Sequence, residues 1–331
     1  MLIINLSQNK SWINFYISST LIENIEKNLE KNKKIILYLN KRWSFSSLIC
    51  KDCQYYYKCK NCDVSLTVHD NQNKVTCHLC WASWNTPISC HKCNWNNLKK
   101  VWVWTKQIED SLNNYFKEKN TLIFRFDLDA VKTKKAKKEA LENLQKANII
   151  IATKMITTGF DFKDIWLIWI ILAEQEFSFS NYNTEEKAYT NITQLIWRWN
   201  RLWEKTDIIM QTFIPDNEII KSISEKNYKT FFLDTLQERK LFHYPPFSEL
   251  IILEYRDKLE KKSLDFMLKL KDKLDQLNKN NEIEIILNKE SFKKNNQYFI
   301  KIVLKGNNLR DFLQKIKNEI FRNSNLSVIF E

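Results

Sequence analysis

The eight cysteines of this sequence lie between residues 50 and 93, where they form four Cys-x-x-Cys pairs. The pairs are Cys50/Cys53, Cys59/Cys62, Cys77/Cys80 and Cys90/Cys93. Two thiolates separated by two residues bind one side of a tetrahedral zinc ion, and two such pairs complete a closed site. Because a reducing cytosol disfavours disulfides, the spacing predicts two structural zinc ions rather than cystines. Neither site leaves a ligand position open, so metal-activated water chemistry is not expected.

The distances along the chain suggest how the four pairs share two metals. Residues 63–76 separate the second pair from the third, which is near the spacing of a zinc ribbon, and the segments 64–68 and 73–76 read as a hairpin. We therefore predict a nested arrangement, in which one zinc is bound by Cys59, Cys62, Cys77 and Cys80 and the other by Cys50, Cys53, Cys90 and Cys93. Pairing in chain order is the alternative, because only residues 54–58 separate the first two pairs. Three histidines could replace a thiolate, but eight thiols make them unnecessary: His69, His78 and His91.

The composition indicates a polyanionic partner and no membrane. The 331 residues include 52 Lys and Arg against 39 Asp and Glu, a formal net charge of +13, which favours binding to nucleic acid. The alternative is that the many Lys, Asn and Ile residues reflect AT-rich coding. No apolar run reaches the ~18 residues of a membrane span, and residues 1–9 lack the features of a signal peptide. We expect a cytoplasmic protein.

Strand and helix patterns alternate in the first part of the chain. Strands are predicted at 35–39, 122–126, 149–152, 165–172 and 208–213, and helices at 20–31, 107–116, 132–146 and 185–196. This alternation predicts an α/β domain with a parallel sheet over residues 1–220. The cysteine-rich module, about residues 48–97, is predicted as an insertion in it.

From residue 221 the pattern changes. A helix at 227–241 is followed by the prolines of segment 243–247, which stop it. Strands at 250–255, 283–287, 298–304 and 326–330 then combine with helices at 259–277 and 309–321. This β-α-β-β-α-β order predicts a ferredoxin-like α+β domain over residues 221–331.

The segment 39–42, the eight cysteines at their spacing, and Arg125-Phe-Asp127-Leu-Asp129 form a distinctive set of motifs. This set resembles the PriA family, the replication-restart helicases of the primosome (primosomal protein N′). Residues 153–162 resemble motif V of the family, and residues 194–201 resemble motif VI of superfamily 2 helicases. The segment 211–215, and Arg239 with residues 244–247, continue the match. The resemblance covers nearly the whole chain and is most specific before residue 250.

The resemblance implies a RecA-like helicase lobe 2 with an inserted double zinc-ribbon module. In such a lobe, Arg198 and Arg201 would project from the start of a helix toward the γ-phosphate of ATP, where a guanidinium stabilises the charge of phosphoryl transfer. Gln194 would lie beside them. The alternative for the two arginines is a pair of surface salt bridges.

The resemblance also implies residues that couple ATP to DNA. Gly159 and Asp161 would link the nucleotide cleft to DNA movement, while Thr153 and Thr158 would contact DNA phosphates. The family often has lysine where this chain has Thr158, which weakens that assignment. Aromatic residues near the cysteines could stack on single-stranded DNA or pack in the core: Phe45, Tyr55, Tyr56 and Tyr57. The implied partners are branched and single-stranded DNA, other primosome proteins and the single-stranded-DNA-binding protein.

The phosphate-binding loop Gly-x-x-x-x-Gly-Lys-Ser/Thr of lobe 1 does not occur in this sequence, and neither does the magnesium-binding acidic motif. Because the chain starts near the point where lobe 2 starts in the family, we expect the C-terminal portion of a helicase, from a split or truncated gene or a partial gene. ATP and Mg²⁺ would bind only with the missing lobe 1, and this chain alone is not expected to hydrolyse ATP. The main alternative is a non-enzymatic zinc-ribbon nucleic-acid-binding protein derived from a helicase. A zinc-binding redox protein is a third possibility.

Glycine and tryptophan occur in unusual numbers. The chain has 2 glycines and 12 tryptophans, whereas average usage predicts roughly 23 glycines. Tryptophan stands at positions where the family has glycine: Trp43, Trp81, Trp102, Trp104, Trp169 and Trp197. Independent substitutions would disrupt folding, and a tryptophan-rich core accounts only for residues such as Trp12 or Trp84. We therefore predict that UGA codons, read as glycine in the source organism, are translated here as tryptophan.

Overall fold

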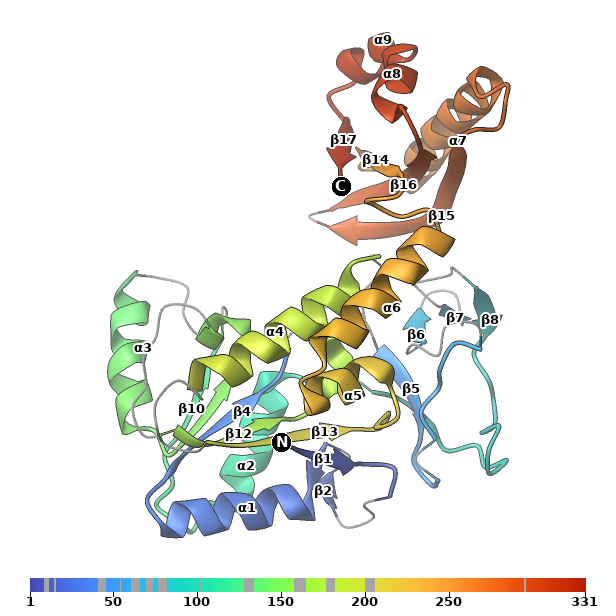
Figure 1. Cartoon of the computed structure of the whole chain (residues 1–331). Coiled ribbons are helices and arrows are strands. Elements are labelled where there is room, and N and C mark those ends of the chain that lie inside the picture. The colour runs from blue at the N-terminus through green and yellow to red at the C-terminus, as the bar shows by residue number, and fades with distance from the viewer. Residues whose placement is uncertain are drawn as a thin grey trace. The chain divides into compact units, whose positions relative to one another are not determined.

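The computed structural model describes residues 1–8, 12–14, 16–40, 46–53, 55–60, 66–69, 74–76, 82–101, 103–127, 134–157, 165–176, 182–199, 206–294 and 296–331. The described chain forms two compact units, Met1–Phe231 and Phe232–Glu331, and each is treated by itself. Their elements are labelled in Figure 1.

A parallel six-stranded sheet forms the centre of the first unit. Its strand order is β1-β13-β12-β4-β11-β10, and each neighbouring pair is parallel. The strands are β1 (Leu2–Asn5), β4 (Lys34–Tyr38), β10 (Ile123–Phe126), β11 (Ile149–Ala152), β12 (Ile165–Ile170) and β13 (Asp207–Thr212). The prediction of a parallel α/β sheet is confirmed. Only β1 was not predicted, because a short edge strand that is partly exposed has no continuous buried pattern.

The helices of this unit lie on both sides of the sheet. Figure 1 shows α4 and α5 on one side and α1 on the other. The helices are α1 (Ser19–Glu30), α2 (Thr105–Tyr115), α3 (Lys134–Lys146), α4 (Thr184–Trp199) and α5 (Glu218–Glu225), with 3-10 turns η1 (Lys154–Thr157) and η2 (Ala173–Glu176). Ser18 caps α1, since its hydroxyl accepts a hydrogen bond from the Leu21 N–H at 3.1 Å.

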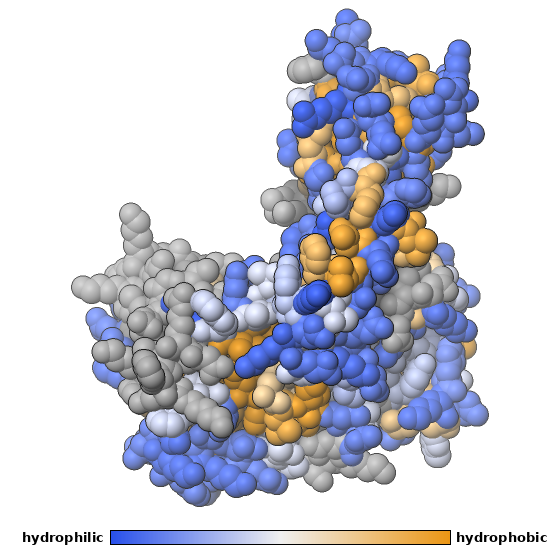
Figure 2. Space-filling model, viewed as in Figure 1, coloured by the Kyte–Doolittle hydropathy of each residue, from blue (hydrophilic) through white to orange (hydrophobic). Residues whose placement is uncertain are grey.

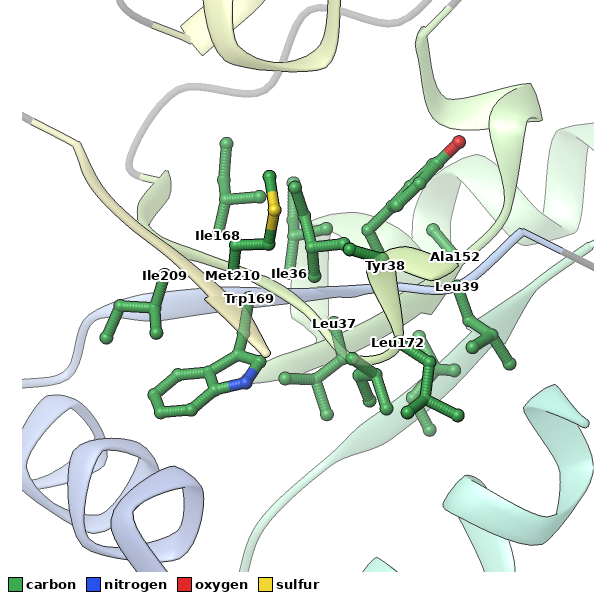
Figure 3. Close-up of a cluster of buried hydrophobic side chains, with 14 of the residues drawn as sticks. Ile36, Leu37, Tyr38, Leu39, Ala152, Ile168, Trp169, Leu172, Ile209 and Met210 are labelled. Atoms are coloured by element: carbon green, nitrogen blue, oxygen red, sulfur yellow. The ribbon is translucent and has the colours of Figure 1, made fainter. Parts of the chain in front are cut away.

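Both faces of the central strands are buried. In Figure 3, Trp169 and Leu37 point to one side of the sheet, while Ile36, Ile168 and Met210 point to the other. Such strands read as continuous apolar runs, which is why the sequence located them. The Trp169 indole is fully buried, and its N–H has no hydrogen-bond partner within the described part of the chain. An unpaired buried donor costs about 1–3 kcal/mol.

The cysteine-rich module contains a small antiparallel sheet of its own. Its order is β8-β7-β6-β5-β9, with β5 (Ser46–Cys50), β6 (Thr67–His69), β7 (Lys74–Thr76), β8 (Ser83–Asn85) and β9 (Leu98–Val101). Strands β6 and β7 pair antiparallel, so the hairpin expected between the second and third cysteine pairs is present. A separate pair, β2 (Trp12–Asn14) and β3 (Ile17–Ser18), precedes α1.

The second unit has an antiparallel sheet near the C-terminus. Helix α6 (Tyr228–Leu241) leads into β14 (Glu249–Asp257), α7 (Glu260–Leu277), β15 (Glu284–Lys294), β16 (Gln297–Gly306), α8 (Leu309–Gln314), α9 (Lys317–Arg322) and β17 (Leu326–Phe330). The sheet order is β15-β16-β14-β17. The expected single helix over 309–321 is two short helices, because the amides of Lys315 and Ile316 bond three residues back and tighten the chain there.

The Arg239 and Tyr-Pro-Pro-Phe motif has a structural role. The Arg239 Nη1 donates to the Pro245 carbonyl at 2.7 Å, and the Tyr244 N–H donates to the Arg239 carbonyl at 2.8 Å. These bonds fix the turn between α6 and β14. Helix α6 also exposes Phe232, Leu233 and Leu241, and Figure 2 shows hydrophobic residues gathered over this helix.

Asparagine occupies most of the described non-glycine positions whose backbone adopts the left-handed conformation that glycine usually takes. Among the described residues, left-handed φ values occur at Asn32, Asn94, Lys226, His243, Asn281, Asn296 and Asn308. Asparagine tolerates this conformation better than most side chains. No described tryptophan has a positive φ, so at Trp104, Trp169 and Trp197 the backbone conformation itself does not require glycine.

None of the described helices combines the length and the hydropathy that a membrane-spanning helix needs.

Candidate functional site

Four thiols of the cysteine-rich module lie close enough to bind one metal ion. The Sγ atoms of Cys50, Cys53, Cys90 and Cys93 all lie within 4.8 Å of one another. The sulfur–sulfur distance is 3.5 Å both between Cys50 and Cys93 and between Cys53 and Cys90. It is close to the sulfur–sulfur distance of about 3.8 Å expected in a tetrahedral site with Zn–S bonds of ~2.3 Å. This group is suited to one zinc ion, and it joins the first cysteine pair to the fourth, as nested pairing predicts.

The β5–β9 ladder places these two cysteine pairs opposite each other. Cys50 ends β5 and pairs with Leu98 of β9. The first knuckle closes when the Cys50 N–H donates to the Tyr55 carbonyl at 2.9 Å, and the fourth when the Asn94 N–H donates to the Cys90 carbonyl at 2.8 Å. Asn94, the residue after the fourth pair, has φ +62°. A sharp left-handed turn at this position lets the knuckle fold back toward its sulfurs.

The thiols of this group differ in how readily they ionise. Burial raises the pKa of Cys53 to about 12. Burial also opposes ionisation of Cys90, but hydrogen bonds from the backbone amides of Cys93 and Lys92 outweigh it and lower the pKa of Cys90 to about 7. These hydrogen bonds thus favour the thiolate of Cys90, the form that binds zinc.

The second predicted zinc site stays a prediction. Of its four cysteines, Cys59 is buried beside Leu66 and Tyr57 in the small core of the module, whereas Cys62, Cys77 and Cys80 lie outside the described residues. The described ligand group contains four cysteines and no histidine. The imidazole of His91 instead packs edge-on against Tyr57, with ring centroids 5.3 Å apart.

The residues predicted to meet ATP and DNA are only partly described. Thr153 follows β11 and is buried, and its carbonyl accepts the Ile156 N–H at 3.0 Å. Gln194 is exposed on α4, one turn before the half-buried Arg198. The other four lie outside the described residues: Thr158, Gly159, Asp161 and Arg201.

Arg198 lies in the last turn of α4 and not at the start of a helix, so that part of the expectation is wrong. Helix α4 continues to Trp199 because no helix-breaking residue lies between Leu195 and Trp199. Glycine in place of Trp197 would destabilise the helix by about 1 kcal/mol. A helix C-terminus carries partial negative charge, which favours a guanidinium there.

A buried carboxylate that was not expected from the sequence, Glu176, connects α4 to the sheet. The Glu176 Oε1 accepts from the Tyr38 hydroxyl at 2.7 Å. Its Oε2 accepts from the side-chain amides of Asn40 at 2.8 Å and Asn191 at 3.1 Å. Glu176 thus joins the end of β4, turn η2 and helix α4. The available signal was a pair of acidic residues, 174 and 176, directly after a buried apolar run.

A second buried carboxylate, Glu174, connects turn η2 to the end of β13. Its carboxylate accepts from the Thr212 hydroxyl at 2.8 Å and from the Phe213 N–H at 3.2 Å. Burial raises the pKa of Glu174 from 4.5 to about 7, although these hydrogen bonds oppose the shift.

Replacing Glu174 with glutamine is expected to flatten the pH dependence of stability. Because the folded protein binds the Glu174 proton more tightly than the unfolded chain, its contribution is complete below pH 4.5 and is lost as pH rises through about 7. The loss is on the order of 3 kcal/mol. Thermal unfolding from about pH 5 to pH 8 should show a smaller fall in Tm for Glu174→Gln. Glu118→Gln, at an exposed position, should retain the parent slope, and equal slopes in all three proteins would contradict the prediction.

The architecture defines a class of protein, a parallel α/β domain interrupted by a cysteine-rich zinc-binding module. Within that module, residues 59–83 match the family model of the PriA DNA helicase Cys-rich region. The replication restart protein PriA of Synechocystis sp. is 30% identical over 229 residues, which are 67% of this chain and 27% of the relative. PriA of Borreliella burgdorferi is 29% identical over 322 residues, 96% of this chain and 47% of the relative.

PriA of Chlamydia pneumoniae is 30% identical over 263 residues, 78% of this chain and 35% of the relative. The chain is therefore a homologue of the PriA replication restart proteins. It spans between 27% and 47% of the length of these three relatives.

Proposed function

We propose that this chain is the C-terminal portion of an ATP-dependent 3′–5′ DNA helicase that restarts stalled replication forks and assembles the primosome. The observation that carries this proposal is the homology with PriA, which extends over 96% of the chain in one relative and includes the cysteine-rich region. The parallel sheet, with a helix bearing Gln194 and Arg198 packed beside it, supports a RecA-like lobe. Its domains are the lobe over 1–220, the zinc insertion over 48–97 and the α+β domain over 221–331.

Within this proposal, the arginines complete a nucleotide site whose other half lies on lobe 1. Arg198 and Arg201 bind the γ-phosphate and stabilise the negative charge that develops during phosphoryl transfer, and Gln194 orients them. Bound ATP and Mg²⁺ supply the driving reaction when lobe 1 is present. Glu176 holds α4 against the sheet through Asn191 and thereby orients the helix that carries Arg198.

The remaining residues of the proposal contact DNA or a second metal. Gly159 and Asp161 couple the nucleotide site to DNA movement, and Thr153 and Thr158 bind DNA phosphates. The second zinc is held by Cys59, Cys62, Cys77 and Cys80. The proposed partners are branched and single-stranded DNA, the single-stranded-DNA-binding protein and other primosome proteins. The formal charge of +13 supports a DNA partner.

A second candidate is a non-enzymatic nucleic-acid-binding protein derived from a helicase. It is favoured by one observation: each of the two glycines, Gly159 and Gly306, is followed by a residue other than lysine, so the sequence has no Gly-Lys-Ser/Thr motif.

Complementation separates the two candidates. The chain is mixed with a second polypeptide that carries a P-loop lobe of a PriA helicase, and ATP hydrolysis is measured with and without forked DNA. The helicase proposal expects no hydrolysis by the chain alone and DNA-stimulated hydrolysis by the mixture. DNA binding without hydrolysis in the mixture would favour the binding protein, and hydrolysis by the chain alone would contradict the two-part motor.

A further inference from the structure

Two consecutive tyrosines after the first knuckle face opposite sides of the chain. Tyr56 forms an antiparallel bridge with Ile49, and both side chains are buried in the core of the large α/β sheet. Tyr57 pairs with Leu48 through a 3.0 Å backbone bond, and these two side chains belong to the separate small core of the cysteine-rich module. This segment therefore belongs to both cores at once. Because Tyr56 and Tyr57 are buried, packing and not base stacking explains them.

Tyr57 positions the fourth cysteine pair. Its hydroxyl donates to the Ser89 carbonyl at 3.3 Å and accepts from the His91 N–H at 3.2 Å. These two residues flank Cys90, which is fully buried. The peptide on either side of Cys90 is thus held against the strand segment that follows Cys53.

Tyr56 connects the same segment to the end of β13. Its ring stacks on Phe213, with centroids 5.8 Å apart and an angle of 7° between the planes. Phe213 directly follows β13, and its N–H donates to the buried Glu174 carboxylate at 3.2 Å. The neighbouring Thr212 carbonyl accepts the Leu6 N–H at 2.8 Å. The ring of Tyr56 therefore packs where β13 leaves the sheet and where Glu174 is anchored.

We propose that the four-cysteine site and the carboxyl end of β13 form one cooperative unit, in which zinc occupancy stabilises this end of the strand through stacking of Tyr56 on Phe213. Zinc holds the knuckles of Cys50 and Cys90 together. It thereby fixes the bridge between Ile49 and Tyr56, the two residues that flank the first knuckle. Without the metal, four sulfurs at these distances, two of them buried, lose their common partner, and the segment that carries Ile49 and Tyr56 is released. Thermodynamic linkage makes the effect reciprocal. If zinc stabilises the end of β13 by a given factor, opening of that end weakens zinc binding by the same factor.

Hydrogen exchange of the full chain, with zinc and after chelation, tests this coupling without ATP or DNA, so it can fail while the proposed function survives. In the parent, peptides covering residues 207–214 should exchange at least about tenfold faster after chelation, because local opening becomes easier. Peptides covering β11 should change little in exchange rate, because β12 and β4 separate β11 from β13 in the sheet. Zinc content is measured in parallel.

Tyr56→Leu should remove the response at residues 207–214 while peptides around Cys50 still respond to zinc. Tyr55→Leu is the matched control, because Tyr55 packs edge-on against Tyr57, with ring centroids 5.0 Å apart, and not on Phe213; it should keep the parent response. If Tyr56→Leu does not fold, Phe213→Leu removes the same contact from the other side. Equal exchange at residues 207–214 with and without zinc in the parent, or a full response in Tyr56→Leu, overturns the proposal.

Discussion

Arg198→Ala is expected to lower DNA-stimulated ATP hydrolysis by the complemented enzyme about 10³-fold or more, the range found when an arginine that stabilises phosphoryl transfer is lost. Arg198 lies in the last turn of α4, which Glu176 ties to the sheet through Asn191. The guanidinium is therefore held on a fixed helix. The measurement is steady-state ATP hydrolysis by the chain mixed with a P-loop lobe, at saturating forked DNA.

Lys187→Ala is the matched control, because Lys187 is an exposed cation on the same helix. It should leave hydrolysis near the parent rate. Arg198→Lys separates charge from geometry: a single ammonium cannot form the two parallel hydrogen bonds of a guanidinium, so the rate should stay low. A parent-like rate in Arg198→Ala, with unchanged folding and DNA binding, would show that this arginine is a surface residue and not part of the nucleotide site.

Trp81→Gly is expected to raise zinc binding from about one ion per chain to about two. Trp81 follows Cys80 directly, as Asn94 follows Cys93, and Asn94 adopts φ +62°. If the third knuckle turns in the same way, tryptophan there is strained by about 1–2 kcal/mol and glycine is not. Zinc per chain, measured by elemental analysis of the purified protein, reports the difference.

Trp84→Gly is the control from the same module, since Trp84 lies within β8 and does not directly follow a cysteine pair, so glycine there should not increase zinc content. Protein isolated from its native host gives an independent check on whether UGA codons encode glycine there. Peptide mass spectrometry should find glycine at positions 81 and 197. Tryptophan at both positions, or two zinc ions bound by the chain with Trp81 in place, would contradict the recoding hypothesis.

The pattern of apolar residues predicted most long helices and central strands, because each of these elements depends on residues that are close together in the sequence. The apolar runs at 149–152 and 165–172 became β11 and β12, since strands of a buried parallel sheet are apolar on both faces. Edge strand β1 has no such run, and its place beside β13 depends on residues about two hundred positions away. The break between α8 and α9 was equally invisible, because neither proline nor glycine marks it.

The sequence by itself determined the ligand chemistry, four Cys-x-x-Cys pairs, and the family to which the chain is homologous, but it left open whether the pairs share metals in a nested order or in chain order. The structure brings the first and fourth pairs together. Ligand spacing is local, because only two residues separate the cysteines of each pair. Only the tertiary structure decided that Glu174 and Glu176 are buried and that Tyr56 contacts the end of β13. Those contacts join segments far apart in the chain, and a side chain's burial depends on which elements pack around it, which no local pattern encodes.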